Sequence, residues 1–237
     1  MKLSIVSPSY NEVGNLTEFV EQIQNILIKK FKTEEFEIII VDDNSLDGSN
    51  KILKNLKKKY KNFHYFIRKD SPRDLSRSCL LGFKNANFDN ILVLDCDLQH
   101  DPKDILKLID QFQSSSYNVV VGARNLFAKV NGLSLFRQFA SVLIIIIFNT
   151  LLKKQTNDPM SGFFIFKKKL FLNSGNFFGK GFKILIDLIY NTNEKVLIKD
   201  VHIDFKLRKA NESKMNAKIL FYIIEFTLRN FFKRLIK

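Results

Sequence analysis

The chain contains short apolar runs separated by segments in which apolar residues recur every three or four positions. The short runs have the length and composition of buried strands, and they occupy residues 3–7, 37–42, 63–67, 90–94 and 118–122. The three-and-four spacing predicts amphipathic helices, the first across residues 16–27 and the second across residues 52–60. A third helix is expected to begin at Pro102, because proline favours the first turn. This alternation predicts an α/β fold in which helices flank a mainly parallel sheet.

Beyond residue 122 the pattern becomes less regular. It predicts a helix near residues 133–152, a short strand at 163–166, a helix around 182–190 and an extended stretch at 196–207. Residues 216–237 form a two-faced pattern, with basic side chains on one side and aromatic and aliphatic ones on the other. Such a C-terminal amphipathic helix suits a membrane surface, a partner subunit or the domain itself. We therefore expect one domain over residues 1–215, followed by this basic helix.

The chain is strongly basic. Its 237 residues carry a formal net charge of +14, and nine Lys and Arg against two Glu place +7 of that charge in residues 205–237. This charge favours a polyanionic partner, which leaves open nucleic acid, an anionic membrane surface and a phosphorylated substrate. Basic and aromatic residues do not alternate along a strand, so nucleic-acid binding is the weakest of these interpretations.

The spacing of the cysteines and the length of the apolar stretches indicate the cellular compartment of the protein. Cys79 and Cys96 lack the C-x-x-C spacing of a redox or zinc motif, which fits a reducing, cytoplasmic setting. The first apolar run meets polar residues at Ser7, too early for a secretory signal. The longest uncharged stretch, residues 138–152, is shorter than the roughly 20 residues that cross a bilayer. We expect no transmembrane helix, and this stretch is either a core helix or a surface helix that dips into lipid.

Three polar loops follow the first, second and fourth predicted strands, at residues 7–12, 42–48 and 95–100. In an open α/β sheet such loops meet at the carboxyl edge, where ligands bind. Asp95 and Asp97 leave the fourth strand one residue apart, so their carboxylates can share a hard divalent cation. The alternative for this pair is turn formation, which aspartate also favours. The sequence has neither a G-x-G-x-x-G fingerprint nor a P-loop, which argues against nucleotide sites of those two kinds.

The loops resemble sequence blocks of a known family. Inverting family 2 glycosyltransferases carry P-x-Y-N-E, V-D-D-x-S-x-D-G and D-x-D-L-Q-H-x-P, which are similar to residues 8–12, 41–48 and 95–102. The second half is similar to the dolichyl-phosphate mannosyltransferase and polyprenyl-phosphate glycosyltransferase branch, through blocks at residues 121–124, 137–141, 158–163, 181–183, 205–208 and 213–214. Three positions depart from that branch. Cys96 replaces Ala, Asp187 replaces Glu and Glu212 replaces Gly, and the last two changes bear on substrate detail rather than on reaction class.

The resemblance implies a GT-A (Rossmann-like) fold with a catalytic domain over residues 1–215. It implies metal-dependent, inverting transfer of a sugar from a nucleotide diphosphate to a polyprenyl phosphate of the dolichyl type, with mannose from GDP-mannose as the leading expectation. The alternative is the same donor chemistry with a glycan acceptor in cell-surface polysaccharide synthesis. The implied setting is cytoplasmic and peripheral, on the inner face of a membrane, in contact with that surface or with a membrane-anchoring subunit.

The resemblance also implies roles for individual residues. Mg²⁺ or Mn²⁺ would be held by the oxygen donors of Asp95, Asp97 and Gln99. The nucleotide sugar would contact Pro8, Tyr10, Glu12, Val41, Asp43, Asp95, Cys96, Gln99, Arg124, Arg208 and Lys214. The acceptor phosphate would bind Arg137 and Ser141, and catalysis would depend on Asp97, Arg124 and Arg137. Because a phosphate acceptor is already anionic, its attack requires positioning rather than a strong base.

Structural alternatives stand beside these assignments. The alternative for residues 43–47 is that they cap the helix expected near Gly48, as Asp47 is expected to do. For Arg124 and Arg208 the alternative is pairing with surface acids. Among the histidines, His100 is expected to shape the loop after Asp97 by hydrogen bonding rather than to bind metal.

Overall fold

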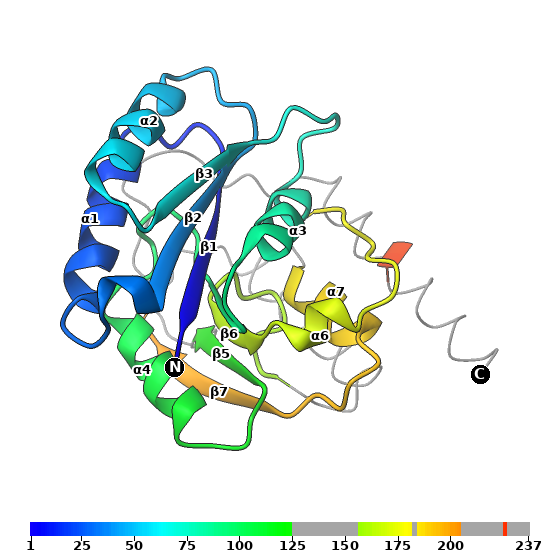
Figure 1. Cartoon of the computed structure of the whole chain (residues 1–237). Coiled ribbons are helices and arrows are strands. Elements are labelled where there is room, and N and C mark those ends of the chain that lie inside the picture. The colour runs from blue at the N-terminus through cyan, green and yellow to red at the C-terminus, as the bar shows by residue number, and fades with distance from the viewer. Residues whose placement is uncertain (125–155, 182–183, 205–224, 227–237) are drawn as a thin grey trace.

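The computed structural model describes residues 1–124, 156–181, 184–204 and 225–226. Its strands form one seven-stranded sheet in the order β3-β2-β1-β4-β6-β5-β7 (Figure 1). The strands are β1 Leu3–Ser9, β2 Phe36–Asp42, β3 Phe63–Ile67, β4 Asn90–Val93, β5 Val119–Arg124, β6 Phe164–Lys167 and β7 Ile198–Ile203. All the predicted strands are present, with ends that shift by a few residues.

Six of the seven strands point the same way. The pairs β1 with β2, β2 with β3 and β1 with β4 are parallel, as is β5 with β7. Strand β6 is the exception, because it is antiparallel to both β4 and β5. The mainly parallel sheet is therefore confirmed, and the carboxyl ends of β1, β2, β4 and β5 meet at one edge.

Helices cover both faces of the sheet (Figure 1). They are α1 Leu16–Leu27, α2 Ser49–Lys59, α3 Leu75–Asn85, α4 Asp104–Gln113, α6 Lys169–Leu172 and α7 Ile184–Asn191. Helices α1, α2 and α4 supply buried side chains such as Phe19, Leu53 and Leu108 to the core on one face. Helices α3, α6 and α7 contribute to a second core on the other face. This is the two-sided arrangement that a parallel sheet requires to bury its apolar strands.

Helix α3 was not anticipated by the sequence pattern. Ser76, Ser78 and Gly82 are buried in this helix, so small and polar residues occupy positions at which the pattern expects large apolar ones. Gly82 lies there because α3 packs closely on β1: a Cβ atom added at Gly82 would lie 2.3 Å from Cγ1 of Val6. The Ser76 and Ser78 hydroxyls donate to the carbonyls of Gly181 and Asp74. The start of the helix is fixed by an N-cap rather than by an apolar pattern. The Asp74 carboxylate accepts hydrogen bonds from the backbone N–H groups of Ser76 and Arg77.

Helix α4 begins at Asp104, and the expectation that it begins at Pro102 was wrong. Residues 101–103 form a turn before it, in which the Asp104 N–H donates to the Asp101 carbonyl at 2.9 Å. The helix expected near residues 133–152 lies outside the described residues. Of the expected C-terminal helix, Glu225 and Phe226 are described, and the Phe226 ring is buried against Phe178 and Tyr190. In the part of the chain that the structure describes, no helix is both long and apolar enough to span a bilayer.

The close approach of α3 to β1 gives the first prediction. Gly82→Ala is expected to lower the free energy of unfolding by about 1–3 kcal/mol, because the added methyl group forces Val6 and the helix apart. The control is Gly14→Ala, at a position where an added Cβ meets no atom within 4 Å. Urea unfolding of both variants measures the difference. Equal stability of the two variants would contradict the close packing.

Candidate active site

Two hydrogen bonds from side chains to backbone carbonyls join the ends of β1 and β4 at the carboxyl edge of the sheet. The Ser7 hydroxyl donates to the carbonyl of Leu94, the residue that precedes Asp95. The Cys96 thiol donates to the carbonyl of Pro8 at 3.3 Å. These contacts fix the backbone from which the Asp95 and Asp97 side chains extend.

The loops after β1 and β2 are also tied to each other. The Asn11 N–H donates to the Ser45 hydroxyl at 2.8 Å, and that hydroxyl donates to the Asp42 carboxylate at 2.6 Å. One carboxylate oxygen of Asp47 accepts from the Val13 N–H at 3.0 Å, and the other accepts from the Ser49 N–H at the start of α2, also at 3.0 Å. Asp47 therefore accepts from the first N–H of α2, although the N-cap residue of that helix is Gly48. The two loops form one rigid wall of the site.

Asp95 and Asp97 lie half-buried at the centre of this edge. A Cβ atom at Gly162 would lie 2.5 Å from Oδ2 of Asp95, so the loop before β6 packs against that carboxylate with no room for a side chain. The Asp97 carboxylate accepts from the Gln99 N–H at 3.1 Å, which places both residues in one tight turn. Within the described ranges, no group of three or more His, Cys, Asp or Glu residues is arranged to hold a metal ion. Two carboxylates and the Gln99 amide are nevertheless all oxygen donors, as a hard divalent cation requires.

Cys96 lies between the two aspartates but its side chain is buried, with 3% exposed. Burial raises the pKa of its thiol well above the usual value, and the negative charges of Glu12, Asp97 and Asp95 raise it further. The sulfur therefore stays protonated and is unsuited to metal binding. The expected contact of Cys96 with a nucleotide stays a prediction.

Arg124 ends β5 beside the aspartates and is held by a buried partner. Its Nε and Nη2 donate to the two carboxylate oxygens of Asp158 at 2.6 and 2.9 Å. Burial alone would lower the pKa of Arg124, but the Asp158 hydrogen bonds and charge, aided by the charge of Asp95, raise it. The guanidinium is thus a fixed positive charge at the edge where phosphates are expected. Its acid partner is buried, with 1% of the side chain exposed, rather than a surface residue.

Asp43, expected to accept from the nucleotide base, organises the segment after β3. Its Oδ1 lies 2.5 Å from Nη2 of Arg68, and its Oδ2 accepts from the Asp74 N–H at 2.6 Å. Burial raises the pKa of Asp43 more than the neighbouring guanidinium lowers it. Asp43 therefore has a clear structural role, and its contact with a base stays a prediction. The same holds for Pro8 and Val41, which are buried in β1 and β2.

Arg73 is a candidate binding residue that the sequence interpretation missed. Its guanidinium lies 4.8 Å from the centre of the Tyr10 ring, and its Nη1 donates to the Tyr10 hydroxyl at 2.6 Å. Its Nη2 donates to the Asn44 carbonyl at 3.4 Å, so it bridges the first two loops. Glu12, in the same first loop, accepts from the Asn15 side chain at 2.7 Å. The sequence could have indicated Arg73 as a binding residue, because it lies in the segment after β3, a strand that ends at the carboxyl edge.

Two carboxylates hold the loop at residues 178–181 through its backbone N–H groups, one from the start of α3 and one from α7. The Gly181 N–H donates to the Asp74 carboxylate at 2.7 Å. Asp187, on α7, accepts from the N–H groups of Phe178 and Gly179 at 2.9 and 2.8 Å. Asp187 therefore shapes this loop from a buried position, which gives a structural reason for an acid there. Arg137, Ser141, Arg208 and Lys214 lie outside the described residues, and their assignments stay predictions.

Solved structures with the same fold define the class. The crystal structure of glucosyl-3-phosphoglycerate synthase from Mycobacterium tuberculosis in complex with phosphoglyceric acid has a TM-score of 0.73, at 15% identity, and covers 97% of this chain and 79% of that one. A structure of the synthase with Mn²⁺ and UDP-glucose has a TM-score of 0.69, at 15% identity, over 98% of this chain and 78% of that one. The fold is that of the GT-A glycosyltransferases, as expected.

Sequence comparison gives the family. Residues 4–174 match the Glycosyl transferase family 2 model, and the chain belongs to that family of enzymes. It is 32% identical to the dolichol-phosphate mannosyltransferase of Pyrococcus furiosus over 232 residues, which cover 97% of this chain and 63% of that protein. It is 30% identical to the dolichol-phosphate mannosyltransferase of Mycosarcoma maydis over 230 residues, with 94% and 76% covered. The chain thus spans less than two thirds of the Pyrococcus relative.

His100 gives a prediction on pH. The side chain is buried beside the Phe163 ring, and burial together with the charge of Arg124 lowers the pKa of His100 from 6.5 to about 3. Between pH 6.5 and about 3 the imidazole is protonated in the unfolded chain but not in the folded one. The free energy of unfolding is therefore highest above pH 6.5 and decreases as the pH falls towards 3. At about pH 5 the loss is on the order of 2 kcal/mol.

Urea unfolding at pH 7 and pH 5 measures this effect, and His100→Gln is expected to remove most of it. The control is His202→Gln, because the His202 side chain on β7 is 62% exposed. A pH dependence that His100→Gln leaves unchanged would show that the imidazole is protonated equally in both states.

Proposed function

We propose that this enzyme transfers a sugar from a nucleotide diphosphate to a polyprenyl phosphate. The observation that carries the proposal is the placement of Asp95 near the fixed guanidinium of Arg124 at the carboxyl edge of the sheet, with Asp97 two residues further along the same loop. This pairing of carboxylates with a fixed positive charge suits a bound diphosphate that leaves with negative charge. The names of the family relatives that match most of the chain support the lipid acceptor.

In the proposed reaction an acceptor phosphate oxygen attacks the anomeric carbon of the sugar. The new bond between carbon and phosphate oxygen forms on one face as the bond to the diphosphate oxygen breaks on the other, so the configuration inverts. The nucleoside diphosphate leaves with the electron pair of the broken bond. The acceptor oxygen carries no proton to be removed, so no general base is needed and the chain supplies alignment. The charge of Arg124 stabilises the departing diphosphate.

A divalent cation fits the described residues. Asp95, Asp97 and Gln99 would hold Mg²⁺ or Mn²⁺ through oxygen atoms, and Gly162 leaves the space that the Asp95 carboxylate needs. When bound, such an ion would neutralise charge on the diphosphate. The Mn²⁺ complex of the structurally similar synthase supports this choice of metal.

The donor and the setting complete the proposal. We infer GDP-mannose as the donor, with its base and ribose against the wall that Tyr10, Glu12 and Asp43 help to form. Arg208 and Lys214 would contact the phosphates, and Arg137 with Ser141 would bind the acceptor phosphate. The enzyme would act peripherally, at the cytoplasmic face of the membrane that holds its acceptor.

The decisive experiment combines the purified protein, Mn²⁺ and a short polyprenyl phosphate with GDP-mannose, UDP-glucose and other nucleotide sugars. The expected result is an organic-extractable mannosyl product of inverted anomeric configuration, seen by mass spectrometry and NMR. If sugar is transferred to a glycan or to phosphoglycerate and no donor gives a lipid product, the polyprenyl phosphate acceptor is wrong and the acceptor is a soluble molecule.

Replacing the paired aspartates tests their role. Asp95→Asn and Asp97→Asn are each expected to lower kcat/KM about a hundredfold or more, because each removes a negatively charged oxygen donor that would hold the divalent cation beside the diphosphate. The matched control is Asp110→Asn, on the outer surface of α4. Steady-state kinetics with saturating Mn²⁺ measures the change. Activity within twofold of the wild-type protein in both site variants would exclude these carboxylates from the site.

Gly162→Ala tests the packing around Asp95 without changing any charge. The added methyl group would displace the carboxylate, since its Cβ would lie 2.5 Å from Oδ2. The expected result is a loss of about tenfold or more in Mn²⁺-assisted GDP affinity, measured by calorimetry. Gly14→Ala is the control, and its affinity should match the wild-type value. If Gly162→Ala binds GDP with Mn²⁺ as tightly as Gly14→Ala does, the metal does not bind at Asp95.

A further inference from the structure

Helix α2 has an unusually basic exposed side. Between Ser49 and Lys59 it has five lysines and no acidic residue, and Lys61 follows two residues after its end. Its buried side consists of Ser49, Leu53 and Leu56, which face the core. Lys51, Lys54 and Lys58 are spaced by three and four residues, so they form a row on the opposite side of the helix.

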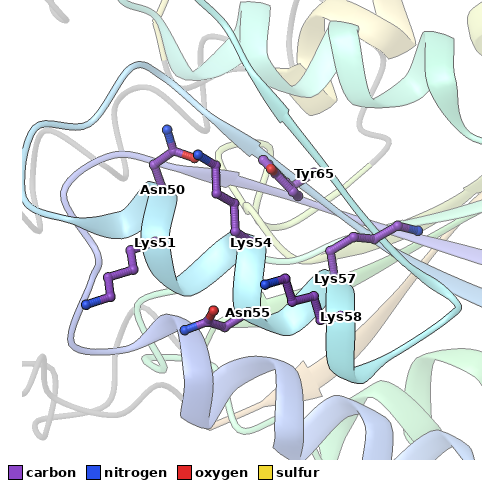
Figure 2. Close-up of a pocket in the computed structure, with 7 residues that line it drawn as sticks. All are labelled: Asn50, Lys51, Lys54, Asn55, Lys57, Lys58 and Tyr65. Atoms are coloured by element: carbon purple, nitrogen blue, oxygen red, sulfur yellow. The ribbon is translucent and has the colours of Figure 1, made fainter.

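The row borders a shallow groove next to the edge of the sheet. The groove has a volume of about 510 Å³, and its lining includes Lys51, Lys54, Lys57, Lys58 and Tyr65 (Figure 2). Tyr65 is on β3, the strand at one end of the sheet order. Four lysines and one half-buried aromatic residue therefore contribute to the same groove lining.

Most of this charge is not neutralised by the protein. Among residues the structure describes, Lys59 is the only lysine of α2 that forms an ion pair, with Glu21 at 2.6 Å. Lys57 instead lies 3.4 Å from a ring nitrogen of His64. Like charges held in a row repel one another, so the arrangement weakens the helix unless an external anion approaches.

An apolar tip precedes the basic row. Leu46, in the loop before α2, has 84% of its surface exposed, and Val13 in the adjacent loop has 38% exposed. The hydrogen bond between the Val13 N–H and Asp47 holds these two loops together at 3.0 Å. Both loops are at the carboxyl edge, so the apolar tip and the candidate active site share one end of the molecule (Figure 1).

We propose that the exposed side of α2, together with the Leu46 tip, docks on an anionic phospholipid surface. Lysines at such a surface are attracted to its negative headgroups, and an exposed leucine at their end can enter the apolar boundary. Docking here brings the Leu46 end of the carboxyl edge close to the bilayer. This proposal rests on the proposed function, because a lipid-borne acceptor phosphate must reach that edge from the membrane.

A membrane suits this surface better than a nucleic acid does. The lysines form a straight row on an exposed helix, and the apolar Leu46 at its end has no counterpart among phosphates and sugars. Single-stranded nucleic acids are held by aromatic side chains on which several bases stack. Tyr65 is the one aromatic residue in this groove lining, and it is half-buried.

The test is co-sedimentation of the full chain with vesicles of phosphatidylcholine alone and of phosphatidylcholine with phosphatidylglycerol in equal parts. The variant is Lys51→Glu/Lys54→Glu/Lys58→Glu. The matched control, Lys84→Glu/Lys103→Glu/Lys199→Glu, makes the same charge change at exposed lysines outside α2. We expect the α2 variant to lose at least about tenfold in binding to the anionic vesicles, and the control to lose far less. Leu46→Ser should weaken binding about fivefold or more without any change of charge.

Equal binding of the α2 variant and the control would overturn the proposal. So would equal binding of the wild-type protein to both kinds of vesicle, or an α2 variant that loses polyuridylate binding while keeping vesicle binding. Transfer to a short polyprenyl phosphate dispersed without vesicles is measured separately, and the α2 variant should retain it. Absence of that transfer in the wild-type protein would refute the proposed function, whereas loss of vesicle binding alone would not.

Discussion

Acidic groups can be packed at the end of a buried sheet only where hydrogen-bond donors or positive charge surround them, and this constraint shapes the whole carboxyl edge. Asp158 is matched by the Arg124 guanidinium, Asp43 by Arg68 and a backbone N–H, and Asp187 by two backbone N–H groups. These three acids are buried. Asp95 and Asp97 are only half-buried. The division separates carboxylates that hold loops in place from carboxylates suited to hold a ligand.

The supporting acids connect parts of the chain that are distant in sequence. Asp43 follows β2, accepts from the residue that caps α3, and that cap in turn accepts from Gly181 more than a hundred residues later. One continuous set of hydrogen bonds therefore runs from the first strands to the loop before α7. Such a set is sensitive to single changes, because removing one partner leaves a buried group without its match.

The α/β class, the strands and the polar loops could be predicted because they depend on local patterns. Continuous apolar runs fix the strands, and the carboxyl-edge rule places the loops that follow them. Helix α3 could not be predicted in this way, since Gly82 is required by close contact with β1 and the buried Ser76 hydroxyl donates to the distant Gly181 carbonyl. The pairing of Arg124 with Asp158 and of Asp43 with Arg68 also depends on tertiary structure. The sequence placed Asp95, Asp97 and Gln99 together, but not the residues that orient their surroundings.

The reversed direction of β6 places two distant parts of the chain at one edge of the sheet. Because β6 runs against its neighbours, the loop that leads into it starts at the same edge at which β5 ends. Arg124, at the end of β5, donates through Nε and Nη2 to both carboxylate oxygens of Asp158 in that loop. Thr156 is held separately, through its hydrogen bond to Asp200 at 2.7 Å. Loss of the single Asp158 side chain would therefore release the end of β5 and the loop before β6 together, so the order of both segments depends on one carboxylate.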